Sequence, residues 1–436
     1  MSKLKTENYK GTRDFFPEEM KLRTWMFGVM KKIVQTFGYE EYDGPLLESL
    51  DIYKAKSGEE IVNRQLYNFT DKGGREVAIR PEMTPTLARM VASKSRELAK
   101  PIRWYSIPNL WRYEAPGHGR LREHWQLNVD LFGVTGFQAE VEIVQLACEI
   151  LFAFGATSKH FKVRFSNRKV LNDFLGKTLG LEESKQQAVA KILDKKNKIS
   201  VDEFNNLISE QLNKPETDLR LVNNFLNSTY TNLSQIAGIE NENSKEIEAF
   251  QREMNKLGYG EVVMFDPSII RGFDYYTGFI FEIFDTSPEN KRSLYGGGRY
   301  DNLIGLFSND ELSGIGFGLG DVTLENFLRT HNLIPSFKKR TGIFACIQSE
   351  SCFSEMAKIS TKLRRVGLMI EMNLDGNLKL GKQIANAEKK GYEFVLIMGE
   401  EELKEQKINL KNLVSGEQKK ISIDDLQLVI QSLTKT

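Results

Sequence analysis

The amino-acid sequence predicts a mixed α and β protein with two domains, the first of which carries a helical insertion. Residues 1–165 mix helical and strand patterns, whereas residues 168–250 are polar and helical, with few strand signals. Strand patterns then return, and beyond a polar link at 335–341 strands and helices alternate. We therefore expect a first domain over 1–334, which contains the insertion, and a small α/β domain over 338–436.

The composition is that of an ordinary globular protein. Of the 436 residues, 27% are charged and 40% hydrophobic, and 60 Lys and Arg nearly balance 59 Asp and Glu. No global charge indicates nucleic acid, so any such surface must be local. The three cysteines, Cys148, Cys346 and Cys352, form no metal-binding pair and favour a reducing compartment. The sequence has neither the apolar core of a signal peptide nor an 18-residue apolar run, which predicts a cytoplasmic protein with no membrane partner.

The insertion shows helical periodicity and no recognisable chemistry. Apolar residues recur at helical spacing at Val189, Ile192 and Leu193. In the next helix, Ser200 and Glu203 have the spacing of a capping box.

The stretch RGFDYYTGFIFEIF at 271–284 has the pattern of a strand with one polar face. Strand side chains alternate between faces, so Asp274, Tyr276 and Glu282 share a face that also carries Gly278. A half-exposed antiparallel strand would give the same pattern and is the alternative at this point.

The stretch HWQLNVDLFG repeats the pattern with different residues. Gln126, Asn128 and Asp130 alternate with apolar residues. These short hydrogen-bonding side chains form strands poorly, and exposed faces more often carry Lys, Glu and Thr. The strand therefore favours a lined pocket over a solvated face.

A third strand, YSIPNLWRYE, leads into a glycine-rich loop with two arginines. Arg112 and Glu114 share one predicted strand face, and Arg120 and Arg122 lie in the loop APGHGRLR. Such a loop can hold phosphates, although a plain hairpin with a basic turn is the alternative.

Two glycine-rich strands complete the pattern. The glycines of YGGGRYD and GIGFGLG leave the strand backbone without side chains, which fits a flat ligand or the close packing of another strand. Neither stretch is a Walker motif or a dinucleotide-binding motif. The four histidines lack the spacing of a metal site, and no nucleophile with its base is evident, so we expect no protein metal site. The remaining Arg, Glu, Gln, Asp and Tyr side chains suit positional and electrostatic catalysis on a polyphosphate.

The motifs, taken in order, resemble the histidyl-tRNA synthetases over nearly the whole chain. YKGTRDFFPEEM resembles their N-terminal signature, and GYEEYDGPLLE resembles the first motif of class II aminoacyl-tRNA synthetases. RPEMTP and WRYE resemble the second-motif region, while RGFDYYTG and GGGRYDNL resemble two peptides peculiar to histidyl enzymes. The domain at 338–436 resembles an anticodon-binding domain. The resemblance implies an α+β catalytic domain, an antiparallel sheet flanked by helices, and a C-terminal α/β anticodon-binding domain.

The resemblance also implies roles for individual residues. Glu82, Thr84 and Gln126 would hold the histidine α-amino group. Asp130 and Tyr276 would contact the imidazole, with Tyr275 nearby; the family usually has Glu where Asp130 stands. The implied catalytic and ATP-binding residues are the following: Arg271 and Arg112 at the reacting groups, with Glu114, Arg120 and Arg122 on ATP.

The implied reaction is a histidine–tRNA ligase reaction. ATP, arriving with Mg²⁺, would activate L-histidine to the adenylate, which then esterifies tRNA(His). The first motif implies a homodimer. The domain at 338–436 has 17 Lys and Arg against 13 Asp and Glu, which suits a nucleic-acid partner, although a solvated surface would explain that balance equally well.

The third motif departs from the family. Many members have Glu-Arg after the glycine strand, where this sequence has Val322 and Thr323. The departure keeps an alternative open, the histidine-binding regulatory subunit of ATP phosphoribosyltransferase, a relative without catalysis. Arg271 and the complete C-terminal domain argue against it. A synthetase for proline or threonine is weaker still, because RGFDYYTG favours histidine.

Overall fold

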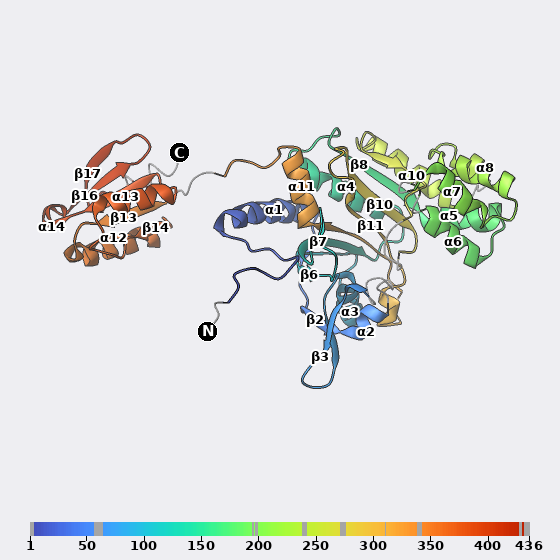
Figure 1. The fold of residues 1–436 in the computed structure, drawn as a ribbon, viewed down its shortest axis with the longest axis horizontal. Coiled ribbons are helices and arrows are strands. Elements are labelled where there is room, and N and C mark those ends of the chain that lie inside the picture. The colour runs from blue at the N-terminus through green and yellow to red at the C-terminus, as the bar shows by residue number, and fades with distance from the viewer. Residues whose placement is uncertain are drawn as a thin grey trace. The chain divides into compact units, whose positions relative to one another are not determined.

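The computed structural model describes residues 4–55, 64–193, 196, 199–237, 242–270, 276–309, 311–337, 342–426 and 430. The chain forms two compact units, Met1–Ile334 and Pro335–Thr436, and each is described by itself (Figure 1).

A nine-stranded sheet forms the centre of the first unit. Its strands are ordered β1-β5-β7-β12-β11-β10-β8-β9, and β6 pairs with β7. Every described pairing is antiparallel except those of β1 with β5 and of β8 with β9, so the antiparallel sheet expected from the resemblance is confirmed. The strands have these bounds: β1 Glu40–Glu41, β5 Ile102–Ser106, β6 Asn109–Trp111, β7 Glu123–Phe132, β8 Phe161–Asn167, β9 Val263–Phe265, β10 Phe279–Asp285, β11 Ser293–Arg299 and β12 Gly314–Gly320.

Helices cover one face of this sheet. The flanking helices are α1 (Pro17–Thr36), α4 (Gln138–Ala153), α10 (Glu242–Lys256) and α11 (Asp321–Thr330). Their apolar residues join Val129, Phe281 and Phe317 of the strands in one buried cluster. A buried ion pair from Arg299 to Glu140, with Nε–Oε1 at 2.5 Å, fixes β11 to α4. Because strand side chains alternate, the opposite face at the centre of the sheet is left for other groups.

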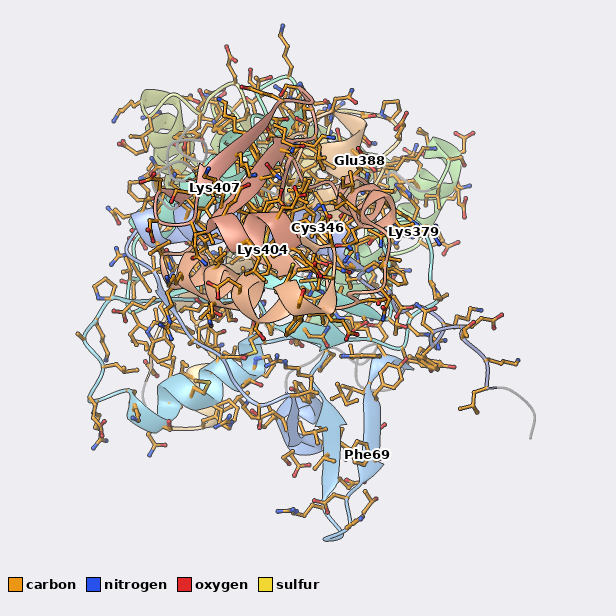
Figure 2. All side chains as sticks on the ribbon, turned by 90° about the vertical axis from the view of Figure 1, so that its left-hand side faces the viewer. Phe69, Cys346, Lys379, Glu388, Lys404 and Lys407 are labelled. Atoms are coloured by element: carbon orange, nitrogen blue, oxygen red, sulfur yellow. The ribbon has the colours of Figure 1, made fainter. Side chains whose placement is uncertain are left out.

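A small three-stranded sheet extends the first unit. It has the order β2-β4-β3 and is followed by a helix that packs back on the main sheet through Leu87. The elements are β2 (Leu47–Ser49), α2 (Leu50–Lys54), β3 (Tyr67–Thr70), β4 (Glu76–Ile79) and α3 (Thr84–Lys94). Figure 2 shows Phe69 on the hairpin of β3 and β4, which projects from the body of the unit; this ring is 48% exposed.

The insertion is helical, as its periodicity predicts. The side chain of Ser200 accepts a hydrogen bond from the backbone N–H of Glu203 and so caps α7. The elements are α5 (Arg168–Asp173), η2 (Phe174–Thr178), α6 (Glu183–Leu193), α7 (Val201–Ser209), α8 (Pro215–Leu226) and α9 (Leu233–Ala237). They group beside β8 and α10 in Figure 1.

The second unit has its own five-stranded sheet, ordered β14-β13-β15-β16-β17. Its apolar clusters are built from its own residues, among them Cys346 on β13 (labelled in Figure 2). The elements are β13 (Ile343–Ile347), η4 (Glu350–Cys352), α12 (Phe353–Arg365), β14 (Ile370–Met372), α13 (Leu380–Lys389), β15 (Phe394–Met398), α14 (Glu400–Glu405), β16 (Lys407–Asn412) and β17 (Gln418–Ser422). The alternation of strands and helices and the final hairpin match the sequence prediction, whereas α14 is not among the predicted elements.

The strand expected over 271–284 is shorter in the structure. β10 begins at Phe279, and residues 271–275 lie outside the described residues. Among the described helices, none is long and apolar enough to cross a membrane.

Candidate active site

A cavity of about 440 Å³ lies on the face of the main sheet opposite the helices. Its floor is made by glycines of two neighbouring strands. Gly296 pairs with Gly318, and Gly298 with Gly316. The missing side chains leave the backbone of β11 and β12 bare, as the glycine pattern predicted. A Cβ at Gly316 would lie 2.4 Å from Asp130 Oδ1, and one at Gly318 would lie 2.0 Å from Gln126 Nε2.

β7 supplies one wall of the cavity. Gln126, Asn128 and Asp130 all line it, which confirms the pocket inferred from their alternation. Across the floor, Glu282 of β10 and Tyr276 line the other side. The ring of Tyr276 lies over Gly298, where an added Cβ would be 3.1 Å from Tyr276 Cδ1.

Asp130 is the deepest carboxylate of this wall and is only 2% exposed. The hydroxyl of Tyr300 donates a hydrogen bond to Asp130 Oδ1. The other oxygen, Oδ2, is buried and accepts a hydrogen bond from no described residue. Burial raises the pKa of Asp130 to about 7, and the hydrogen bond from Tyr300 opposes this shift in part. Oδ2 of Asp130 can therefore accept a hydrogen bond from a ligand that enters the cavity.

Tyr276 adds a neutral polar group beside this carboxylate. Burial, together with the charges of Glu82 and Asp130, raises the pKa of Tyr276 far above its ordinary value. Its hydroxyl therefore stays protonated at neutral pH and can donate or accept a hydrogen bond.

The segment before α3 and the stretch after β6 contribute charged groups. Glu82 is 2% exposed, and Thr84 is the first residue of α3. Arg112 donates from Nε to the carbonyl of Pro81 at 2.8 Å, and this bond does not use the two terminal nitrogens of its guanidinium. All three side chains line the cavity. β6 ends at Trp111, so Arg112 follows the strand and the strand-face argument for it was wrong; Arg112 lines the cavity from the connecting stretch.

The loop after Arg112 brings a second arginine to the cavity. Glu114 and Arg120 both line it, and Arg120 Nη1 lies 3.3 Å from Glu114 Oε2. Arg122 lies elsewhere: its guanidinium carbon is 4.1 Å from the centre of the Tyr113 ring, and Nη1 donates to the hydroxyl of Tyr9 at 2.9 Å. The structure thus brings Arg120 to the cavity and places Arg122 where it supports the loop.

A second cavity of about 180 Å³ shares residues with the first. It is also lined by His124, Val322 and Thr323. Burial lowers the pKa of His124 to about 3, with the charges of Arg112 and Arg13 adding to the effect, so its ring is neutral. A flat neutral ring and an apolar side chain, which both line this cavity, are suited to a planar heterocycle.

The hydroxyl of Thr323 forms its hydrogen bond with a backbone carbonyl. Its hydroxyl donates to the carbonyl of Leu294 at 2.8 Å. Its methyl carbon would be 3.6 Å from a Cβ at Gly119, in the loop that carries Arg120. The loop therefore lies against the position where many family members have arginine.

The N-terminal signature helps to hold the third-motif helix. Asp321, the first residue of α11, pairs with Arg13 at 2.6 Å and accepts a hydrogen bond from the backbone N–H of Trp125 at 3.0 Å. These contacts connect α11, which lines the second cavity, to β7, which lines both.

Two predicted site residues cannot be placed. Arg271 and Tyr275 lie outside the described residues, and so does Asp274. The sequence prediction in turn missed Tyr300 and Gln65, which line the cavity. Neither belongs to a strand with alternating polarity, so only their three-dimensional position identifies them. Among the described residues, no group of three or more His, Cys, Asp or Glu could hold a metal ion.

Comparison with known proteins gives matches over both units. The family model described as histidyl-tRNA synthetase matches residues 11–322, and the model described as anticodon binding domain matches residues 337–433. The histidine–tRNA ligase of Leptospira biflexa is 57% identical over 434 residues, which is 99% of each chain. That of Thermoplasma volcanium is 35% identical over 99% of this chain and 100% of its own.

Solved structures share the fold. Histidyl-tRNA synthetase from Nostoc has a TM-score of 0.80 at 24% identity and covers 99% of this chain and 100% of its own. A Bacillus halodurans protein titled as an ATP phosphoribosyltransferase regulatory subunit/histidyl-tRNA synthetase has a TM-score of 0.76 at 24% identity, covering 91% of this chain and 99% of its own.

A helix-flanked antiparallel sheet with a polar cavity on its bare face, followed by a separate α/β domain, is the class II aminoacyl-tRNA synthetase fold, and the family models place the chain in that class. Within that class, the chain belongs to the histidyl-tRNA synthetase family. The full-length match to a curated ligase also means that the regulatory-subunit alternative is not favoured.

Proposed function

We propose that the protein is a histidine–tRNA ligase, which activates L-histidine with ATP and transfers it to tRNA(His). The observation that carries the proposal is the gathering of Gln126, Asp130 and Tyr276 with Arg112 and Arg120 around one cavity, in a chain of this family.

The proposed histidine site lies between β7 and β10. Asp130 Oδ2 has no hydrogen-bond donor among the described residues, and an imidazole N–H would supply one. Tyr276 would contact the same ring, with Tyr275 nearby. An imidazole that carries its second proton would also favour the ionised form of Asp130, whose pKa burial raises to about 7.

The α-amino group would bind at the opposite end of histidine. Glu82 offers a carboxylate, while Thr84 and Gln126 offer neutral oxygens, and all three line the cavity. A carboxylate facing an ammonium is a charge-assisted hydrogen bond, the stronger kind in a buried site.

The proposed ATP site continues toward the loop. Arg112 would bind the α-phosphate, Glu114 would help to place the nucleotide, and Arg120 would meet the outer phosphates with Arg122 behind it. Guanidinium groups suit this task because they are always charged and match phosphate oxygens. We expect ATP to bring Mg²⁺ as its counter-ion, which neutralises phosphate charge during transfer.

The chemical step is an in-line displacement. A carboxylate oxygen of histidine forms a bond to the α-phosphorus of ATP, while the bond to the bridging oxygen breaks and pyrophosphate leaves with its electron pair. Negative charge builds on the α-phosphate oxygens, and Arg112 and Arg271 would stabilise that charge. In the second step, a hydroxyl of the terminal ribose of tRNA attacks the carbonyl carbon, and AMP leaves.

The second unit would bind the tRNA. Its residues match the anticodon-binding model, and its excess of basic residues favours a polyanion. A cytoplasmic location stays a prediction, which the three free cysteines support because such thiols persist in reducing compartments.

The direct test of the function is histidine-dependent exchange of pyrophosphate into ATP by the purified protein. We expect exchange with histidine and none with proline or threonine. Lack of exchange under conditions where the chain is folded and binds ATP would refute the proposal.

We also propose that the protein is a homodimer. The first-motif stretch at 38–48 carries Leu46 and Leu47, which are 45% and 46% exposed, and in the class this motif builds the subunit interface. Light scattering at micromolar concentration should give about twice the chain mass of 49.9 kDa. A mass near that of one chain would contradict the proposal.

A further inference from the structure

We propose that His118 is a positioning residue, which fastens the loop of Arg120 to the turn between β10 and β11 through Asn290. His118 Nε2 lies 3.1 Å from Asn290 Oδ1, although the two residues are 172 positions apart in sequence. The contact acts on Arg120, so its role in catalysis rests on the ATP site proposed above.

The loop places His118 at the tip of a tight turn. The backbone N–H and C=O groups of Gly117 and Arg120 pair in both directions, each at 3.0 Å. Gly119 has a φ of 74°, which suits the second central position of a type II turn. His118 therefore occupies the first central position, and its exposed side chain is free to reach a neighbouring element.

The hydrogen-bonding direction at Asn290 is fixed by its other partners. Its amide nitrogen donates to Asp285 Oδ2 at 2.7 Å and to Thr330 Oγ1 at 3.2 Å. A carboxylate oxygen only accepts, so the amide nitrogen must face Asp285 and the amide oxygen must face His118. The imidazole consequently donates from Nε2, which it does in one neutral tautomer and also as the cation.

Asn290 is held by residues that have further contacts of their own. It is 8% exposed, and the side chain of Asp285 is fully buried. Asp285 Oδ1 lies 2.7 Å from His331 Nε2, and the ring of His331 stacks on that of His160 with centres 4.6 Å apart. The loop tip is thus bound to a turn that is itself held by His160, just before β8, and by Thr330 and His331 at the end of α11.

The consequence concerns the arginine two positions after His118. The side chain of Arg120 is 54% exposed, and its described ion-pair partner, Glu114, belongs to the same connecting stretch. Without the contact to Asn290 the tip of the turn would move more freely with its arginine, and ATP would have to order both on binding. A fastened tip pre-organises Arg120 at the cavity.

The first test measures loop opening without using activity. Trypsin cleaves after Arg120 only when the turn opens. We expect His118→Ala to increase the rate of that cleavage by about three- to tenfold, the range that one net hydrogen bond supplies. Cleavage after Lys72, in the exposed turn between β3 and β4, is the internal control and should not change. His118→Gln, which keeps a donor, should restore protection.

Kinetics then connect the loop to the reaction. In histidine-dependent pyrophosphate exchange, His118→Ala should raise the KM for ATP by about three- to tenfold and leave the KM for histidine unchanged. Asn290→Ala should act in the same way, and the double variant should be no worse than the more severe single one. Lys291→Ala, next to Asn290 and exposed, is the matched control.

The outcomes separate the two proposals. A wild-type protein without exchange activity would refute the ligase function, and the trypsin comparison would still decide whether His118 fastens the loop. Equal cleavage of wild type and His118→Ala, or additive effects of His118→Ala and Asn290→Ala, would overturn the positioning role.

Discussion

At the scale of single residues, Asp130 combines deep burial with one oxygen that no described residue satisfies. A carboxylate in this state makes the site selective, because a ligand without a donor leaves it unpaired. Its side chain is one methylene shorter than the Glu usual in the family. The hydroxyl of Tyr300 holds it in place.

Asp130→Asn should raise the KM for histidine by about tenfold, because a hydrogen bond to a charged group contributes roughly 1.5–3 kcal/mol. The amide keeps the shape and can still accept from Tyr300, so the fold should persist. Steady-state exchange kinetics with varied histidine measure the change. Unchanged histidine kinetics would remove Asp130 from the binding site.

Arg271→Lys should slow adenylate formation by about 10²–10³, the usual loss for one preorganised electrostatic group. Lysine keeps the charge but not the planar pair of donors. Single-turnover kinetics and thermal melting on the same variant separate catalysis from structure. A large fall in Tm with a nearly normal chemical step would show that Arg271 is structural.

At the scale of secondary-structure elements, the glycines of β11 and β12 have two different tasks. Gly318 faces the cavity, where an added Cβ would meet the flexible end of Gln126 at 2.0 Å. Gly297 faces the other way, where an added Cβ would meet the backbone oxygen of Gly316 at 2.0 Å. A side chain can move aside, whereas a paired strand cannot without losing its register.

Gly318→Ala should therefore leave Tm nearly unchanged and reduce histidine activation by about tenfold or more, since Gln126 loses its place. Gly297→Ala, the matched variant on the other face, should lower the free energy of unfolding by about 1–3 kcal/mol. Thermal melting and exchange assays on both variants test the contrast. Equal loss of Tm in the two would contradict it.

The sequence predicts the lining of the cavity well where the lining residues alternate along a single strand. On β7 the alternation of Gln126, Asn128 and Asp130 was enough to predict a lined pocket, because burial on one face forces the period of two. The role of Tyr300 follows from no local pattern, since the residue comes after β11 and meets Asp130 only through the fold. The contact of His118 with Asn290 could not be predicted from the sequence for the same reason. Long-range contacts between side chains leave no trace in local periodicity.

At the scale of the whole molecule, the two units have separate sheets and separate apolar clusters. Deletion of residues 338–436 should therefore leave a folded first unit. We expect pyrophosphate exchange to persist in the shortened protein while charging of tRNA falls by about tenfold or more, because contacts to the polyanion are lost. Loss of exchange in a well-folded shortened protein would contradict this division of work.

The stability of the first unit should depend on pH through Asp130. Its pKa in the folded protein is about 7, above the ordinary value of 3.8. Between these values the folded protein keeps a proton that the unfolded chain releases. The contribution of this group to stability is therefore full below pH 3.8 and is lost as the pH rises to about 7, a change on the order of 4 kcal/mol.

Asp130→Asn does not titrate, so it should melt at a higher temperature than wild type at pH 8 without ligand. The difference should be smaller at pH 5, where the wild-type carboxyl is protonated. Thermal melting at both values measures it. An identical difference at pH 5 and pH 8 would mean that another group controls the effect.

The unsatisfied oxygen of Asp130 also connects the protein's lifetime to its amino-acid supply. A ligand that binds only the folded state shifts the folding equilibrium by mass action, by about 2.7 kcal/mol at one hundred times its Kd. Bound histidine would add this stabilisation at Asp130, whose buried carboxylate destabilises the protein without ligand. A cell rich in histidine should therefore lose fewer copies of the protein to proteolysis than a starved one. Protease half-lives with histidine and with an amino acid that does not bind would measure the difference, and equal half-lives would refute it.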